Sequence, residues 1–283
     1  MRKGTKKISD FLLILVFLTG LSLLLYPSIS DYWNSFHQSR AIASYAEAVA
    51  RLDDEPYEQY WKAAQDYNAA LPGNKNRYLP TEEEKEQYEN LLNVSGNGIM
   101  GYIEIPAIGV SLSIYHGVED TVLQIAIGHI EGSSLPVGGA GTHCVLSGHR
   151  GLPSAKLFTD LDQLSAGDTF LLRVLDEVLT YEVDQIHIVE PQEISLLEIE
   201  DGEDLCTLVT CTPYGVNSHR LLVRGHRVEN QKNVSSIRVT ADAIQVEPVL
   251  VAPAVAAPML LALLVWLFIS SPKKGSKKKD GKE

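Results

Sequence analysis

Two apolar segments flanked by basic residues constrain this 283-residue chain more than any other feature of it. The first, residues 11–26, follows a basic N-terminus. The second, residues 249–269, contains no charged residue and precedes a lysine-rich C-terminus. A run of about 20 apolar residues is long enough to cross a bilayer as a helix. Because lysine and arginine mark the cytoplasmic side of a membrane, both ends are expected inside the cell and the middle of the chain outside.

The N-terminal segment permits two interpretations. Its length, followed by Ser28-Ile29-Ser30, is compatible with a signal peptide that is cleaved after export. An uncleaved membrane anchor is the interpretation that we favour. Both interpretations export the middle of the chain, so we expect the protein at the cell membrane with its folded part extracellular.

The charge distribution excludes a nucleic-acid-binding protein. The net charge of −12 is the sum of two basic ends and a central part in which 14 basic residues stand against 33 acidic ones. A body this acidic repels phosphate groups. The 45% hydrophobic and 21% charged composition is that of a globular protein, so the acidic middle is expected to fold.

Periodic patterns divide the exported part into a helical front and a strand-rich body. Apolar residues spaced by three and four predict amphipathic helices at residues 42–52 and 60–71, and Thr81 before three acidic residues predicts the start of a third. Beyond Gly98 one further helix is predicted, at 155–164. Many short strands separated by turns favour a closed barrel or a sandwich. The predicted strands are residues 101–106, 110–115, 143–146, 169–174, 179–189, 205–209 and 220–223.

Cysteine usage gives the first indication of chemistry. Cys144, Cys206 and Cys211 are too few for a disulfide scaffold in an exported domain of this size, and an odd number leaves a free thiol. Cys211 ends the predicted strand 205–211, directly before the turn-forming residues 212–215. A thiol at a strand end reaches solvent while the strand holds it rigid. The alternative for such a residue is a buried structural cysteine.

An arginine is predicted beside this thiol. Residues 218–223 have the pattern of a strand that returns after the turn. If the two strands pair with Cys211 opposite Arg220, their Cβ atoms lie about 5 Å apart. A guanidinium there favours the thiolate, which is the nucleophilic form, and stabilises negative charge on an attacked carbonyl oxygen. An arginine on a solvated strand is the alternative.

A cysteine nucleophile also needs a proton donor for its leaving group. His149 stands between glycines at the end of an apolar strand, where a barrel presents side chains at its rim. His129 and His219 are the competing candidates, although His219 points away from the face that carries Arg220. A metal site would have to use His143, Cys144, His149 and Cys206, but their spacing matches no known metal-ligand motif.

These residues resemble those of a known family. Thr207–Cys211 is similar to the T-L-x-T-C signature of sortases, the exported cysteine transpeptidases of Gram-positive bacteria. Residues 147–150 and 217–221 resemble the segments that hold the family's histidine and arginine. The resemblance covers roughly residues 40–230. The C-terminal apolar segment, the helical front and residues 148–153 are similar to the pilin-polymerising class, class C.

The resemblance implies a mainly β fold, an eight-stranded sortase barrel with N-terminal helices and flanking transmembrane segments. Cys211 would attack the Thr–Gly bond of a Leu-Pro-x-Thr-Gly-like sorting signal and form a thioacyl enzyme. Arg220 would hold the substrate or the oxyanion, and His149 would protonate the departing amine. A lysine amine of a second pilin subunit would then accept the acyl group, without any metal or organic cofactor. The implied partners are pilins or surface proteins that carry such signals.

Three other functions remain as alternatives. They are a sortase that attaches surface proteins to peptidoglycan, a hydrolytic cysteine peptidase and a membrane-tethered adhesion domain.

The Asp-Pro-aromatic lid motif of many class C enzymes is missing from residues 77–81, and residues 54–57 lie too early in the chain to supply it. Either residues 72–81 cover the site, with Tyr78 as the large side chain, or the groove is open.

The expected segments are a basic tail with an anchor or signal (1–29), a helical region with a lid candidate (30–97), the catalytic barrel (98–235), a linker (236–248), a transmembrane helix (249–270) and a basic cytoplasmic tail (271–283).

Overall fold

The computed structural model describes residues 2–74 and 76–230. The chain divides into two compact units, of which one comprises Ile29–Ala241 and the other Met1–Ser28 with Asp242–Glu283. The predicted linker, C-terminal transmembrane helix and basic tail therefore lie outside the described residues, as do the last residues assigned to the barrel.

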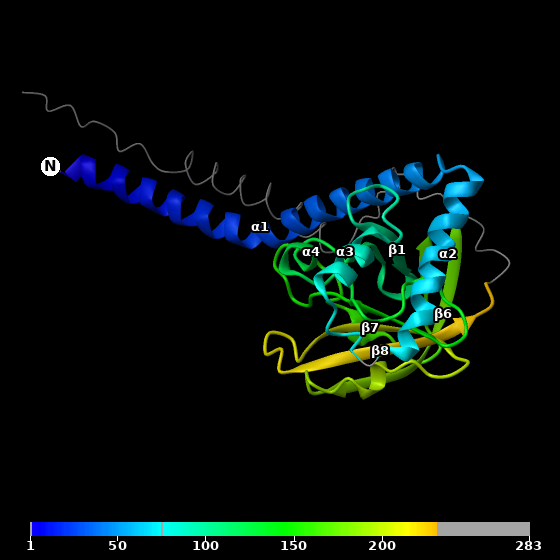
Figure 1. Cartoon of the computed structure of the whole chain (residues 1–283). Coiled ribbons are helices and arrows are strands. Elements are labelled where there is room, and N and C mark those ends of the chain that lie inside the picture. Colours follow the sequence, from blue (N-terminus) through cyan, green and yellow to red (C-terminus); the bar gives the residue numbers. More distant parts are fainter. Residues whose placement is uncertain (1, 75, 231–283) are drawn as a thin grey trace, which may run out of the picture. The chain divides into compact units, whose positions relative to one another are not determined.

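The helical front consists of three helices, α1 (Arg2–Val49), α2 (Asp54–Ala70) and α3 (Glu82–Asn90), with a short 3-10 turn η1 (Leu71–Gly73) after α2. The two predicted amphipathic helices are thus the end of α1 and the C-terminal part of α2, which begins six residues earlier than predicted (Figure 1). Helix α3 begins at the predicted cap, because Thr81 accepts a hydrogen bond from the backbone of Glu84 while the Glu84 carboxylate accepts one from the backbone of Thr81.

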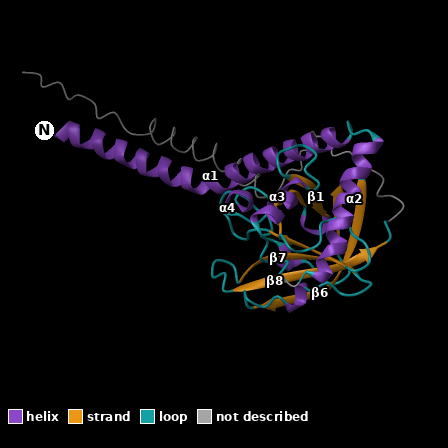
Figure 2. Ribbon diagram, viewed as in Figure 1, coloured by secondary structure: helices purple, strands orange, loops and turns teal. Residues whose placement is uncertain are grey.

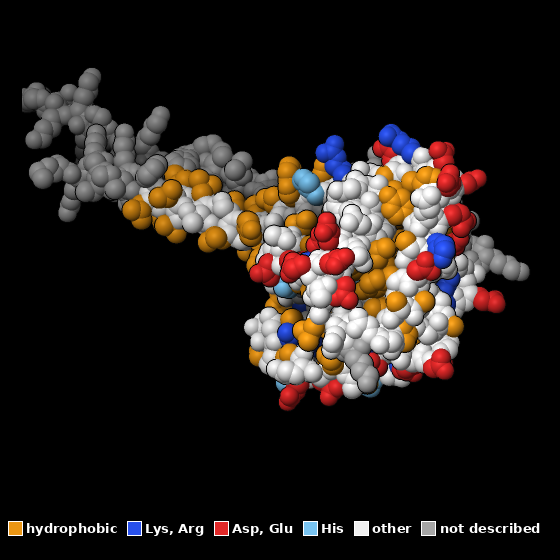
Figure 3. All heavy atoms as spheres, in the orientation of Figure 1, with side chains coloured by type: hydrophobic (Ala, Val, Ile, Leu, Met, Phe, Trp, Pro, Cys, Tyr) orange, Lys and Arg blue, Asp and Glu red, His pale blue; other side chains and the backbone are white. Residues whose placement is uncertain are grey.

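Helix α1 changes character along its length. Leu12–Val49 is the one stretch, within the described part of the chain, that is long and apolar enough to cross a membrane. Its first half exposes apolar side chains, drawn orange in Figure 3. Near its end, Ile42, Tyr45 and Val49 are buried, and the Tyr45 hydroxyl donates to the Met100 carbonyl. The last turns of α1 therefore belong to the core of the folded unit.

Eight strands form a closed barrel in the order β1-β2-β3-β4-β7-β8-β6-β5 (Figure 2), which confirms the predicted fold class. Pairing is parallel between β2 and β3 and between β4 and β7, and antiparallel elsewhere. The strands are β1 (Ile99–Ile105), β2 (Val110–His116), β3 (Ile127–His129), β4 (Thr142–Ser147), β5 (Thr169–Val174), β6 (Glu177–Val189), β7 (Asp204–Thr212) and β8 (His219–Val228).

The predicted helix at residues 155–164 is wrong. This segment is a loop that ends in a single 3-10 turn, η3 (Leu161–Gln163). Leu157 has a φ of 42°, a left-handed conformation that interrupts a right-handed helix. The helix-like spacing of apolar residues has another cause, because Phe158 and Leu161 are fully buried anchors that pin the loop to the barrel core.

Several short elements had no prediction. Strand β3 has three residues and helix α4 (Asp120–Leu123) has four, which is too short for any periodicity to show. The other two are the 3-10 turns η2 (Pro106–Ile108) and η4 (Ser195–Leu197). Of these, η4 matters most for the site, because it lies in the long loop between β6 and β7.

Candidate active site

The β7–β8 hairpin brings a thiol and a guanidinium together. Cys211 and Arg220 are directly paired across the two antiparallel strands, as predicted. Cys211 is a free cysteine and is half-buried at the end of β7. The Arg220 guanidinium donates to the backbone carbonyls of Asn217 and His219, at 3.3 and 3.2 Å. Both acceptors are neutral, so these contacts orient the guanidinium without neutralising its charge.

A small apolar cluster lies on the outer face of the barrel, next to the thiol. Because side chains alternate along a strand, Val209 on β7 and Leu222 on β8 lie on the same face as Cys211 and Arg220. Together with Val145 of β4 they form a small buried cluster outside the main core, covered by Leu197 from η4. Strand β7 is therefore buried on both faces. The loop between β6 and β7, which carries Leu197, covers this cluster beside the strand end that holds Cys211.

The register of β4 places His149 at the same end of the barrel. Strands β4 and β7 run parallel with Ser147 paired to Val209, so a residue two positions further along lies level with Cys211. Two hydrogen bonds hold this approach, from the Thr210 hydroxyl to the Gly148 carbonyl at 2.7 Å and from the Gly148 amide to the Val209 carbonyl at 3.0 Å. The three predicted residues thus converge on one end of β4, β7 and β8.

A glycine is required before this histidine. A Cβ atom on Gly148 would lie 2.7 Å from the Phe158 ring and 2.9 Å from Ile127. No other residue fits between these buried side chains without displacing them. The chain therefore leaves β4 along a fixed path, and the backbone at His149 is set by the packing beneath it.

Comparison with known proteins agrees with this geometry. Residues 103–228 match the family model of the sortase domain. The crystal structure of sortase C1 from Streptococcus agalactiae is 49% identical, with a TM-score of 0.66, over 68% of this chain and 100% of that one. Sortase C of Streptococcus pneumoniae is 43% identical, with a TM-score of 0.59, over 68% and 97% of the two chains. The chain belongs to the sortase family.

Its solved relatives place this sortase in class C. Curated relatives are more distant. Sortase D of Bacillus subtilis is 30% identical over 131 residues, which cover 45% of this chain and 63% of that protein, less than two thirds of its length. Sortase A of Bacillus anthracis is 25% identical over 224 residues, or 79% of this chain and 96% of that protein.

His129 and His219, the other candidates for the proton donor of this sortase, do not face the thiol. His129 is fully buried, with Nδ1 beside the Tyr88 hydroxyl at 2.9 Å and Nε2 beside the Ser134 carbonyl at 2.9 Å. His219 is paired with Thr212, one position away from Arg220, and so points to the other face of β8. Neither ring is directed toward the thiol of Cys211.

The other two cysteines lie inside the barrel. Cys144 and Cys206 are neighbours on the parallel strands β4 and β7, and both are buried in the main core. Burial raises the pKa of the Cys206 thiol well above its usual value. At Cys144 burial also favours the neutral thiol, but contacts with Cys206 and His129 outweigh it and lower the pKa to about 6. The structure therefore leaves Cys211 as the accessible thiol of the three.

The segment at residues 72–81, which we call the strap, is docked on two loops. Arg77 forms an ion pair with Glu198 of the β6–β7 loop at 2.8 Å, and its guanidinium lies 4.8 Å from the centre of the Tyr78 ring. The β3–β4 loop lies directly beneath, since a Cβ on Gly132 would be 2.2 Å from the Arg77 carbonyl.

The strap is docked far from the thiol. The His143 ring, on β4 opposite Leu205 of β7, lies 2.7 Å from the Glu198 carbonyl. Leu205 precedes Cys211 by six residues, which corresponds to about 20 Å along an extended strand. The docked strap thus lies near the end of β7 opposite to the thiol, and its contacts do not support the expectation that Tyr78 covers Cys211.

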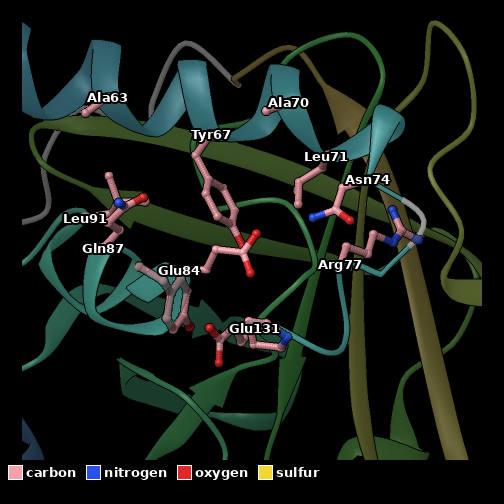
Figure 4. Close-up of a pocket in the computed structure, with 12 residues that line it drawn as sticks. Ala63, Tyr67, Ala70, Leu71, Asn74, Arg77, Glu84, Gln87, Leu91 and Glu131 are labelled. Atoms are coloured by element: carbon pink, nitrogen blue, oxygen red, sulfur yellow. The ribbon is translucent and has the colours of Figure 1, made fainter. Parts of the chain in front are cut away.

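A separate cavity of about 370 Å³ lies between α2, the strap and α3 (Figure 4). Tyr67 points into it from α2 toward Glu84 and Glu131. Burial raises the pKa of the Glu131 carboxyl above its usual value. None of the three predicted catalytic residues lines this cavity, so it is not the place where a substrate would meet the thiol.

Proposed function

We propose that this sortase is a membrane-anchored cysteine transpeptidase that assembles pili. It cleaves a Leu-Pro-x-Thr-Gly-like sorting signal between Thr and Gly and joins the new carboxyl end to a lysine amine of a pilin subunit. The observation that carries this proposal is the convergence of Cys211, His149 and Arg220 at one end of strands β4, β7 and β8, next to an apolar cluster.

The reaction follows from the positions of the three side chains. The Cys211 sulfur attacks the threonine carbonyl carbon, and the Arg220 guanidinium stabilises the negative oxygen that forms. The carbon–nitrogen bond breaks as His149 gives a proton to the departing glycine amine, which leaves a thioester on the enzyme. A lysine amine then attacks the thioester, His149 takes its proton, and the carbon–sulfur bond breaks to release the Cys211 thiolate as an isopeptide bond forms.

The apolar cluster of Val145, Leu197, Val209 and Leu222, beside the thiol, suits an extended peptide that carries apolar side chains. Burying one leucine-sized side chain against it contributes about 1.5–3 kcal/mol to binding. The bound signal lies along β7 with its scissile bond at the strand end, where the thiol is.

The choice of acceptor rests on the relatives. The structure of the Streptococcus pneumoniae sortase C is described in terms of pilin substrate specificity, and a Streptococcus agalactiae sortase C1 belongs to a pilus island. Those enzymes are 43% and 38% identical to this chain, so a pilin lysine is the acceptor we propose. Attachment to peptidoglycan uses the same first half-reaction, and hydrolysis replaces the amine by water.

The apolar first half of α1 supports attachment to the membrane. With a basic N-terminus inside the cell, the barrel lies outside, at the surface of a Gram-positive bacterium. An acidic barrel suits that location, because it does not adhere to the anionic lipids next to it. Figure 3 shows acidic side chains, drawn red, spread over the face formed by the helices and the loops beside them.

The test uses the full-length protein, a Leu-Pro-x-Thr-Gly peptide and a pilin with its own lysine acceptor. Mass spectrometry should detect a thioester on Cys211 and then an isopeptide-linked product. Cys211→Ala should abolish both with an unchanged melting temperature, whereas the matched variants Cys206→Ala and Cys144→Ala should retain activity. A released acid without any amine product would indicate a peptidase. Loss of activity in Cys206→Ala equal to that in Cys211→Ala would disprove the assignment of the nucleophile.

A further inference from the structure

Arg150, the residue after His149, connects three segments around the site. Its side chain is only 9% exposed and forms an ion pair with Asp162. One guanidinium nitrogen lies 3.4 Å from the Thr212 hydroxyl, and the guanidinium lies 5.9 Å from the centre of the Tyr214 ring. Thr212 directly follows the proposed nucleophile. A single side chain therefore ties the histidine loop to the β7–β8 turn and to the loop that holds Asp162.

The backbone on both sides of Arg150 is held by that same loop. The amide of Phe158 donates to the His149 carbonyl at 3.1 Å, and the amide of Gly151 donates to the Thr159 hydroxyl at 3.1 Å. Phe158 is fully buried in the barrel core, so the loop is a fixed support. The backbone of the histidine loop is thus held by residues 158 and 159, and the Arg150 side chain connects the same loop to Thr212, next to Cys211.

The histidine loop and the β7–β8 turn are also in direct contact. Gly151 has a φ of 76°, and a Cβ atom there would lie 2.9 Å from the Tyr214 ring. The Tyr214 ring therefore packs directly against the histidine loop.

The arrangement is unfavourable for stability alone. The Arg150 Nε atom is buried and has no hydrogen-bond partner among the described residues. Burying a guanidinium that is incompletely hydrogen-bonded destabilises a fold, and apolar replacements of such residues are often more stable. A residue of this kind is expected where geometry matters more than stability.

We propose that Arg150 is a positioning residue for the transfer reaction. It sets the separation between the His149 ring and the Cys211 sulfur by fixing the histidine loop against Thr212 and Asp162. The inference rests on the proposed function, in which His149 is the proton donor and Cys211 the nucleophile. Arg150 itself contacts neither the substrate nor the reacting atoms, so its loss should slow the chemical steps and leave peptide binding unchanged.

The experiment compares Arg150→Ala and Arg150→Lys with a matched control in the full-length protein. Arg173 is the control, because its side chain is also 9% exposed and pairs with Glu104 at 2.8 Å, but on β5, which pairs only with β1 and β6. We measure kcat and KM for cleavage of a Leu-Pro-x-Thr-Gly peptide, together with the melting temperature of each variant. Arg150→Ala should lower kcat roughly 100-fold, the effect of a displacement near 1 Å, with KM unchanged.

The conservative variant and the control distinguish positioning from folding. Arg150→Lys keeps the charge opposite Asp162 and should recover part of kcat, whereas Arg173→Ala should lower the melting temperature without lowering kcat. If Arg150→Ala does not fold, Asp162→Asn removes the ion pair from its exposed side and should lower kcat in the same direction.

Three results would overturn the inference while the proposed function stands, provided that Cys211→Ala is inactive. They are a wild-type kcat in both Arg150→Ala and Asp162→Asn, a raised KM with an unchanged kcat, and an equal loss of kcat in Arg173→Ala. Full activity in Cys211→Ala would instead overturn the proposed function itself.

Discussion

At the scale of single residues, the site is defined by which side chains share a face of the β7–β8 hairpin. Cys211 and Arg220 are cross-strand partners, while Cys206 occupies the opposite face of β7, inside the barrel. One strand thus carries a buried thiol and an accessible thiol five residues apart. Position on the strand, and not the residue type, separates a structural cysteine from the proposed nucleophile.

Replacement of Arg220 by lysine tests what the guanidinium contributes. The change Arg220→Lys keeps the charge but loses the planar set of donors, which a compact ammonium cannot reproduce. Removing one oxyanion donor costs about 2.7–4 kcal/mol in other acyl-transfer enzymes, or 10²–10³-fold in kcat. Steady-state cleavage of the sorting-signal peptide would show this loss. A rate near that of wild type would mean that Arg220 supplies only a positive charge.

At the scale of elements, the strap and the β6–β7 loop form one connected unit. Arg77 of the strap pairs with Glu198, and the carbonyl of Glu198 accepts a hydrogen bond from the His143 ring of β4. The β6–β7 loop, which covers the apolar cluster, is therefore held from the helical front on one side and from the barrel on the other. Movement of the strap is expected to change the position of this loop before it changes the surroundings of the thiol.

Release of the strap should alter peptide binding without altering the reactivity of the thiol. In Arg77→Ala the ion pair to Glu198 is lost, and the strap is released from the β6–β7 loop at little cost because its neighbouring described residues, 72–74, 76 and 78–80, are exposed or half-buried. We expect a changed KM for the sorting-signal peptide and an unchanged rate of Cys211 alkylation. Tyr78→Ala is the companion variant, and faster alkylation of its Cys211 by a bulky reagent would show that Tyr78 covers the thiol after all.

The His143 ring makes this region sensitive to acid. Its burial, the largest influence, lowers the pKa of His143 below the usual 6.5. The unfolded chain then binds the proton more readily than the folded one. The contribution of His143 to the free energy of unfolding is therefore fully present above pH 6.5 and is lost as the pH drops below it. The slope is at most about 1.4 kcal/mol per pH unit for one group. Urea unfolding of wild type and His143→Asn at pH 7.5 and 5.5 measures how the free energy of unfolding changes with pH. An identical change in the variant would contradict the assignment of the acid sensitivity to His143.

At the scale of the whole molecule, helix α1 serves two units. Its first half is apolar and exposed, whereas Ile42, Tyr45 and Val49 complete the core of the folded unit that starts at Ile29. The Tyr45 hydroxyl connects the barrel strands β1 and β5 at their ends, since it donates to the Met100 carbonyl and accepts from the Leu175 amide. The segment that we propose to enter the membrane thus belongs to the same helix as the residues that pack into the barrel core.

Two truncations separate these contributions. Removal of residues 1–28 leaves the folded unit whole, so its melting temperature should stay close to that of the full chain. Removal of residues 1–53 also deletes the buried end of α1, and loss of one large aromatic side chain from a core alone costs about 3–5 kcal/mol. Circular dichroism melting curves of both fragments measure the difference. Equal melting temperatures would mean that α1 does not stabilise the barrel.

The sequence by itself determined the helical front, most strands of the barrel and the pairing of Cys211 with Arg220, and it predicts the export of the middle of the chain. The confirmed features depend on local periodicity and on a hairpin whose two strands adjoin in the chain. The sequence also predicts a helix at residues 155–164 that does not form, because buried anchors of an irregular loop have the same spacing as one face of a helix.

Only the tertiary structure decided the contacts between segments distant in the chain. The parallel pairing of β4 with β7 brings residues about 60 positions apart to one level, and it places His149 beside Cys211 while His129 becomes a buried ring. The link from Arg150 to Thr212 and Asp162, and the docking of the strap on Glu198, arise in the same way. Such contacts depend on how elements pack and on the buried charges that result, and neither leaves a periodic pattern in the sequence.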